Sequence, residues 1–106
     1  MLTRKDLLLI IAALQFWADE MAPGDTQMLK LYAGDPAADQ VWTPDAIQRL
    51  RRQLASARLK YAVANASGTA LLATELFPTP RTAEQARTTA TDQVGTLLLP
   101  DPSESV

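Results

Sequence analysis

The chain has 106 residues and a net charge of −2, and it contains no cysteine and no histidine. The length predicts one domain, and the missing residue types exclude disulfides, sulfur-ligated zinc and the commonest general base near neutral pH. We therefore expect a non-enzymatic protein that holds no metal and no cofactor.

The first predicted element is a helix near the N-terminus. Thr3 can cap it, and Asp6 suits the positive end of its dipole. Apolar residues recur at helical spacing and form one face of this helix: Leu7, Ile10, Ile11, Leu14, Trp17, Ala18 and Met21. Further apolar residues extend around the helix, which is more than a thin core should cover. We predict a partner or homodimer interface formed by Leu8, Leu9, Ala12, Phe16 and Trp17.

The same apolar run resembles a secretory signal only superficially. Asp6 stands between the basic pair and the run, and no small-residue cleavage site follows it. The run is also shorter than the roughly 20 residues that span a bilayer. We expect a cytoplasmic protein without a membrane partner, and the alanine content and the excess of arginine over lysine favour a bacterial one.

Two further helices are predicted before the middle of the chain. The first covers residues 26–33, with Asp25 as its cap and a Gly-Asp-Pro sequence as its end. The second covers residues 44–56, where Thr43 is the cap and Pro44 suits the first helical position.

Residues 58–77 are predicted to form an antiparallel hairpin. In its first half Leu59, Tyr61 and Val63 alternate with Lys60, Ala62 and Ala64, and the turn sequence Asn65-Ala-Ser-Gly68 follows. Gly68 is expected to have a positive φ angle. An alternative with one helix over 44–66 and another over 69–77 stays open, although the Asn-x-x-Gly turn and the prolines that follow favour the hairpin.

A short helix capped by Thr82 is predicted over 82–89, then a third strand over 94–99 and a disordered tail over 100–106. Together these elements predict a single α+β domain over residues 1–99. In it, two or three N-terminal helices pack on a small antiparallel sheet.

The charge is unevenly distributed. Residues 1–45 carry three basic and seven acidic side chains, residues 46–74 five basic and none acidic, and residues 75–106 two basic and five acidic. The middle segment either complements the acidic ends within the fold or binds an anionic partner. The candidate anion-binding residues are Arg49, Arg51, Arg52, Arg58 and Lys60.

Residues 42–54, Trp-Thr-Pro-Asp-Ala-Ile-Gln-Arg-Leu-Arg-Arg-Gln-Leu, resemble the opening helix of small helix-turn-helix regulators of the phage-repressor type. This resemblance implies a nucleic-acid-binding regulator that uses the basic segment 49–60. Residues 69–77, where a recognition helix would follow, contain no Arg, Asn or Gln to read bases. The leading hypothesis is therefore a protein-interaction or regulatory module, with the nucleic-acid-binding regulator as its alternative.

Overall fold

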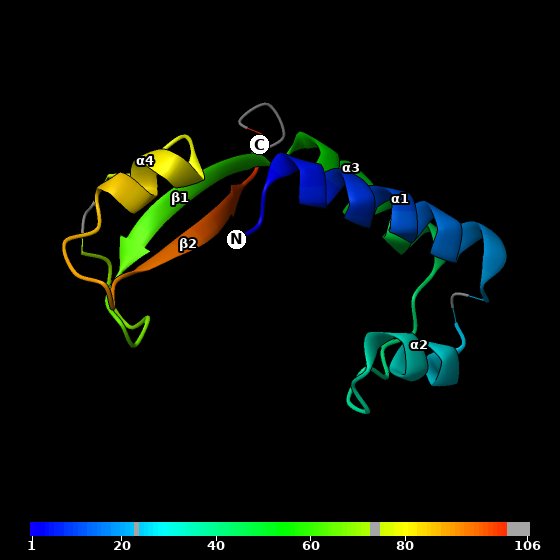
Figure 1. Ribbon diagram of the computed structural model, residues 1–106. Helices are drawn as coiled ribbons and strands as arrows, with labels where there is room; N and C mark the ends of the chain where they lie inside the picture. Colours follow the sequence, from blue (N-terminus) through cyan, green and yellow to red (C-terminus); the bar gives the residue numbers. More distant parts are fainter. Residues whose placement is uncertain (23, 73–74, 102–106) are drawn as a thin grey trace. The chain divides into compact units, whose positions relative to one another are not determined.

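The computed structural model describes residues 1–22, 24–72 and 75–101. Over these residues the chain forms, in order, α1 (Arg4–Glu20), α2 (Thr26–Ala33), α3 (Pro44–Ser56), β1 (Arg58–Ala64), α4 (Pro80–Gln85) and β2 (Gln93–Leu99) (Figure 1). The two strands form one antiparallel sheet. This combination of helices with a small antiparallel sheet confirms the predicted α+β class.

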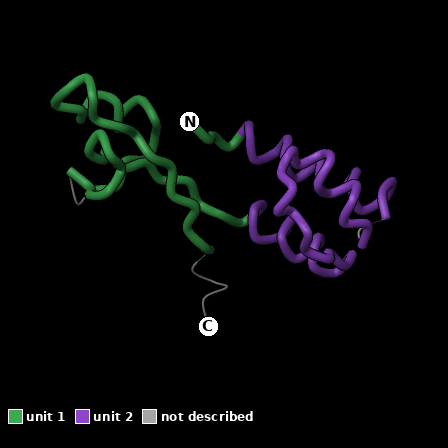
Figure 2. Tube along the Cα trace, turned by 90° about the horizontal axis from the view of Figure 1, so that it is seen from below, with its two compact units in different colours: residues 1–4, 56–106 green, residues 5–55 purple. Residues whose placement is uncertain are grey.

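The chain divides into two compact units (Figure 2). We call Lys5–Ala55 the helical unit, and Met1–Arg4 together with Ser56–Val106 the sheet unit. The single domain over residues 1–99 stays a prediction. The disordered tail predicted at 100–106 lies outside the described residues from residue 102 onward.

Local capping fixes the ends of the helices in the helical unit. The Asp25 carboxylate accepts two backbone N–H groups of the first turn of α2, at 3.0 and 3.2 Å. Gly34 ends α2 with a φ of 68°, in the left-handed region that favours glycine. The Thr43 hydroxyl accepts a backbone N–H of the first turn of α3 at 3.1 Å. The predicted boundaries 26–33 and 44–56 are therefore confirmed.

Side-chain hydrogen bonds link α1 to α3, and each helix buries one aliphatic residue. Leu7 on α1 and Ile47 on α3 are almost fully buried. Arg51 donates through Nε to the backbone carbonyl of Ile11 at 3.1 Å, and through Nη1 to the Gln48 side-chain oxygen at 2.8 Å. The guanidinium of Arg51 therefore serves the packing of the two helices.

The predicted turn at Asn65–Gly68 is confirmed. Gly68 has a φ of 70°, and its N–H donates to the Asn65 carbonyl at 3.0 Å. The Asn65 side-chain oxygen also accepts the N–H of Thr69 at 2.9 Å. Because the residues before the turn form strand β1, the alternative helix over 44–66 is wrong.

The second hairpin strand, predicted after this turn within 69–77, is wrong in extent. Among its described residues, only Leu71 and Phe77 bridge β1, opposite Ala64 and Tyr61 respectively. Tyr61 and Phe77 exchange two backbone hydrogen bonds, at 2.8 and 2.9 Å. Alanine and glutamate, both present in this segment, fit a pleated sheet poorly, and its described residues meet β1 only at these isolated bridges.

The continuous partner of β1 is β2. The two strands pair from Arg58 opposite Leu99 to Ala64 opposite Gln93. The third strand predicted at 94–99 is confirmed, and β1 lies between it and the returning segment.

Helix α4 supplies the core of the sheet unit. Tyr61 and Val63 on β1 and Ala83 on α4 are buried together. The partly buried residues packed against them are Leu59, Phe77, Ala86 and Val94. This cluster lies where α4 contacts both strands.

The predicted position of α4 needs a correction. The helix begins at Pro80 and ends at Gln85, whereas the sequence predicted a cap at Thr82 and a helix over 82–89. The Thr79 hydroxyl is the actual cap and accepts the Thr82 N–H at 3.2 Å. Pro80 suits the first helical position, where its missing N–H costs nothing, so the helix starts earlier.

A cap-like cluster around Asp92 precedes β2. The carboxylate accepts the backbone N–H groups of Thr88 and Thr89 at 2.9 and 3.1 Å, and their hydroxyls at 3.0 and 2.7 Å. These bonds, the one from the Thr89 hydroxyl foremost, lower the pKa of Asp92 to about 2. The buried carboxylate thus fixes the loop that leads into the sheet.

Candidate functional site

A cavity of about 360 Å³ lies within the helical unit. Every residue that lines it is aliphatic or aromatic: Ile10, Ala13, Leu14, Trp17, Leu29, Tyr32, Ala33, Trp42, Ile47 and Leu50. Ligand-binding pockets of proteins have volumes of roughly 300 Å³ and more and are mostly apolar. The cavity therefore has the size and chemistry of a binding site for an apolar group.

Each of the three helices contributes one apolar face to the cavity. Ile10, Leu14 and Trp17 follow one another at the four- and three-residue spacing that places side chains on one face of α1. Trp17 meets Tyr32 of α2 edge to face, with ring centroids 5.7 Å apart. Trp42 lies just before the cap of α3. The short helices and their caps thus hold three aromatic side chains around one space.

The chain segment around α2, a helix that supplies three of the lining residues, is acidic. Residues 19–45, which include α2 and the connections on both of its sides, carry six carboxylates and one lysine, a net charge of −5. All six carboxylate residues are exposed: Asp19, Glu20, Asp25, Asp35, Asp39 and Asp45. An uncharged cavity in a unit with an acidic segment suits a ligand with an apolar body and positive charges.

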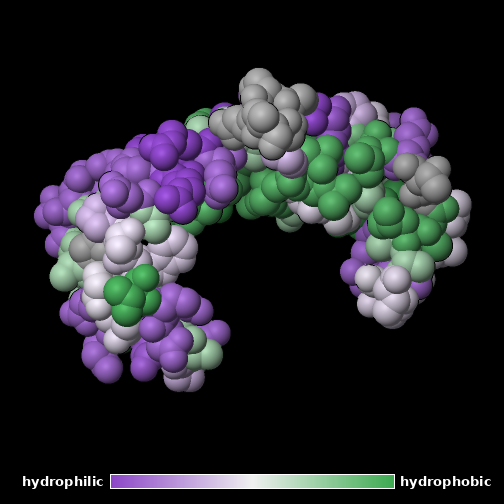
Figure 3. All heavy atoms as spheres, turned by 180° about the vertical axis from the view of Figure 1, so that it is seen from behind, coloured by the Kyte–Doolittle hydropathy of each residue, from purple (hydrophilic) through white to green (hydrophobic). Residues whose placement is uncertain are grey.

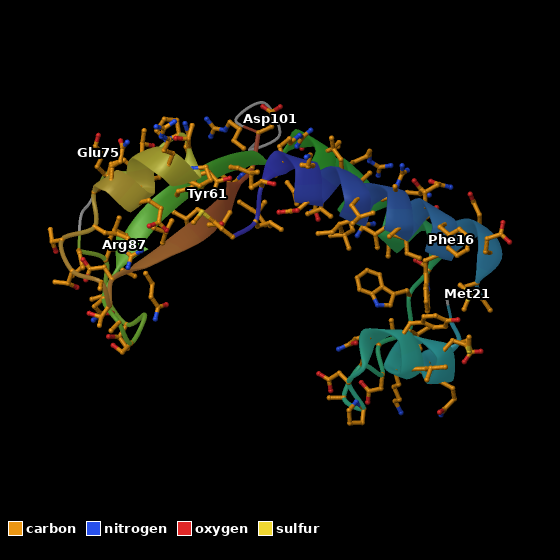
Figure 4. The ribbon with its side chains drawn as sticks, in the orientation of Figure 1. Phe16, Met21, Tyr61, Glu75, Arg87 and Asp101 are labelled. Carbon is orange, nitrogen blue, oxygen red and sulfur yellow. The ribbon has the colours of Figure 1, made fainter. Side chains whose placement is uncertain are left out.

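The structure divides the interface predicted on the first helix into two parts. Leu8, Leu9 and Phe16 are 56%, 72% and 64% exposed, and Ala12 is exposed as well. Phe16 lies on α1 in Figure 4. Trp17 instead is half-buried and lines the cavity.

The predicted anion-binding residues are divided as well. Arg49 and Arg52 are exposed on α3, one helical turn apart, whereas Arg51 is half-buried against α1. Arg58 and Lys60 belong to β1 in the sheet unit, and Arg58 donates to the carbonyl of Pro100 at 3.4 Å. Within the helical unit, two of the three arginines are thus available to solvent.

Sequence reasoning missed the cavity. The sequence pattern placed Trp17 in a predicted partner interface and indicated no pocket at Tyr32 or Trp42. The available signal was the number of aromatic side chains relative to the few helices that could bury them. Three of the chain's six aromatic residues lie in the stretch 17–42, which belongs to the helical unit. The three helices of that unit are too few to enclose them.

The described residues contain neither a candidate metal site nor a helix that could span a membrane. No group of three or more acidic, histidine or cysteine side chains there is arranged to hold a metal ion. None of the helices in that part of the chain has the length and apolar character needed to cross a membrane.

Comparison with known proteins gives no relative on which to base a function. No protein-family model, no curated protein and no solved structure matches this chain. The geometry of the chain is therefore the basis for its functional assignment.

Proposed function

We propose that this chain is a non-enzymatic protein-interaction module whose helical unit binds a basic amphipathic helix of another protein. The observation that carries the proposal is the apolar cavity of about 360 Å³, lined by ten aliphatic and aromatic residues. An amphipathic helix binds such a site by inserting one or two large side chains, while its polar face stays in water. The proposal places the protein in the cytoplasm.

The lining residues support binding more than catalysis. Among them, only the Tyr32 hydroxyl and the indole N–H groups of Trp17 and Trp42 are polar. Tryptophan and tyrosine contribute large contact areas at low cost in conformational entropy, and they are enriched among residues that dominate binding energy.

The acidic segment around α2 supports a basic partner. Six exposed carboxylates against one lysine over residues 19–45 would attract lysine and arginine side chains on the rim of a docked helix. An acidic helix of the same shape would be repelled. Charge therefore selects among helices that the cavity alone would accept.

The two tryptophans of the chain provide the test, because both line the cavity. The protein is titrated with an amphipathic peptide of leucine and lysine while tryptophan emission is recorded. We expect a saturable shift of the emission to shorter wavelength. A peptide with glutamate in place of lysine should bind at least about tenfold more weakly. If a scrambled leucine–lysine peptide binds as well as the amphipathic one, the proposal is wrong.

A matched pair of variants tests the location. Ala13 lines the cavity, and its neighbour Ala12 is exposed and does not. Ala13→Leu should weaken binding of the basic peptide by about tenfold, because the added carbons occupy the space of the inserted side chain. Ala12→Leu should bind like the wild type. Equal affinities of the two variants would contradict binding in the cavity.

A partner interface through Leu8, Leu9, Ala12 and Phe16 stays a prediction, and this exposed surface adjoins the proposed binding site along α1. The second candidate function is nucleic-acid binding by the basic segment 49–60. Its support is the exposure of Arg49 and Arg52 on α3.

A further inference from the structure

One edge of the sheet carries backbone groups without a partner among the described residues. Both backbone groups of Tyr61 bond to Phe77, so they point away from β2. Thr96 is the direct partner of Tyr61 in the register, and its own N–H and C=O must therefore point away from β1. By the alternation of an antiparallel pair, the same holds for Val94 and Leu98.

The sequence of this edge lacks the charged residues and prolines that usually protect an edge strand, and the Thr96 hydroxyl donates to the Leu2 carbonyl at 3.4 Å. The sequence of β2, Gln-Val-Gly-Thr-Leu-Leu-Leu, has no charged residue and no proline. Leu97 and Leu98 are 37% and 45% exposed. In Figure 3 hydrophobic residues gather over the sheet unit, on the face seen from behind. Another β-strand is the structure that satisfies both the backbone groups and the exposed leucines.

We propose that two copies of this chain pair through β2, antiparallel and about a two-fold axis at Thr96. In this register, Thr96 faces Thr96 of the second copy, and Val94 faces Leu98 of the second copy. These are the residues whose backbone groups point outward, so every outward N–H on the edge finds a carbonyl. This inference does not depend on the proposed binding of a helix.

The side chains of the strand complement themselves in this register. Leu98 of one copy covers Val94 of the other, which already packs against the core cluster of Tyr61. On the opposite face, Leu97 lies across from Gly95, where nothing occupies the space that a Cβ atom would fill. Neither strand carries a charge, so no electrostatic repulsion opposes the contact. The large side chain of Leu97 meets Gly95, which has none. These features commit the edge to a second copy of the same strand.

The inference can be tested by placing a charged residue at Thr96, on the proposed two-fold axis, and measuring the mass of the full chain by sedimentation equilibrium. The wild type should sediment as a dimer, at twice the chain's 11.5 kDa. Thr96→Lys and Thr96→Asp each place like charges opposite one another, so each alone should dissociate at least about tenfold more readily. An equimolar mixture of the two variants should dimerise again. A monomeric wild type, or variants that dimerise alone, would overturn the inference.

Phe16→Lys is the control for the interface predicted on α1, since Phe16 is exposed there. This variant should remain dimeric. If it is monomeric while Thr96→Lys stays dimeric, self-association uses α1 and the pairing through β2 is wrong.

Amide hydrogen exchange of the wild type keeps the inference testable even if the Thr96 variants do not fold. The N–H groups of Gly95 and Leu97 bond to β1 and should be protected at every protein concentration. The N–H groups of Val94, Thr96 and Leu98 should become protected only as the concentration rises. Fast exchange of these three at all concentrations would contradict the dimer.

Discussion

The two units of this chain satisfy their apolar residues in different ways. The sheet unit buries Tyr61, Val63 and Ala83 to 3% exposure or less in one closed cluster. Among its described residues the helical unit buries only Leu7 and Ile47 to that extent, and it arranges Trp17, Tyr32 and Trp42 around a cavity. A closed cluster stabilises the fold, whereas an open cavity leaves apolar surface for a ligand. Stability should therefore depend mainly on the sheet unit, and binding on the helical unit.

The two tyrosines of the chain test this comparison most strongly, because each unit contains one. Tyr61 is 3% exposed and its hydroxyl donates to the Leu2 carbonyl at 3.0 Å, whereas Tyr32 is 68% exposed. Tyr61→Ala should lower the free energy of unfolding by about 3–5 kcal/mol, and Tyr32→Ala by less than about 1 kcal/mol. Urea denaturation followed by circular dichroism measures both.

The same variants test whether the chain is one domain. Both tryptophans lie in the helical unit, so their fluorescence reports on that unit alone. If residues 1–99 unfold as a single domain, Tyr61→Ala should shift the fluorescence transition together with the circular dichroism. A fluorescence midpoint that does not move would mean that the units unfold independently, and the predicted single domain would be wrong.

Substituting either of the two glycines with positive φ should lower the free energy of unfolding by a similar amount, smaller than that expected for Tyr61→Ala. Gly34 ends α2 and Gly68 closes the turn after β1, with φ of 68° and 70°. No atom crowds the space that a Cβ would occupy at either position. Alanine substitution should therefore cost only the conformational penalty, about 1 kcal/mol at each site in the free energy of unfolding. A cost well above this at one site would mean that contacts outside the backbone conformation decide its stability.

Local signals explain which elements the sequence could predict. Asp25 with Gly34, Thr43 with Pro44, and Asn65 with Gly68 each specify a cap or turn through their nearest neighbours, and the structure places all three where expected. These rules act over a few residues and need no knowledge of the rest of the chain.

The sequence-based predictions failed where contacts between residues far apart in the chain determine the structure. The run 69–77 and strand β2 are both candidates to pair with β1, and only the packing of the whole sheet unit gives β2 the continuous ladder. The cavity depends likewise on three helices at once. For that reason the sequence pattern indicated an apolar face containing Trp17 and could not separate it from the exposed residues of α1.

The loop before β2 should make the sheet unit sensitive to acid. The pKa of Asp92 is about 2 in the fold and rises to its ordinary value of 3.8 on unfolding. A pKa that folding lowers gives stability that is complete above the ordinary value and is lost as the pH falls from about 4 toward 2. Asp92→Asn should lower stability at neutral pH and flatten this acid dependence. The exposed Asp39→Asn is the control and should leave the pH profile of urea unfolding unchanged.

The smallest effect is expected for nucleic-acid binding. The charges of the helical unit decide between this function and the binding of a basic helix. Arg49 and Arg52 are exposed in the helical unit, but Arg51 is held by the Ile11 carbonyl and by Gln48. That unit also carries seven acidic side chains against five basic ones. A site with four or five phosphate contacts would lose affinity steeply with salt. Two exposed arginines on an acidic unit fall short of such a site.

We therefore expect no binding to duplex or single-stranded DNA tighter than about 10⁻⁵ M at physiological salt. Fluorescence anisotropy with labelled oligonucleotides at two salt concentrations measures this. The double variant Arg49→Glu with Arg52→Glu is the matched control and should change little. Submicromolar, salt-sensitive binding that the double variant abolishes would reverse the assignment. The exposed face of α3 would then be the functional surface, and the cavity between the helices would be a by-product of a small unit that cannot enclose its aromatic residues.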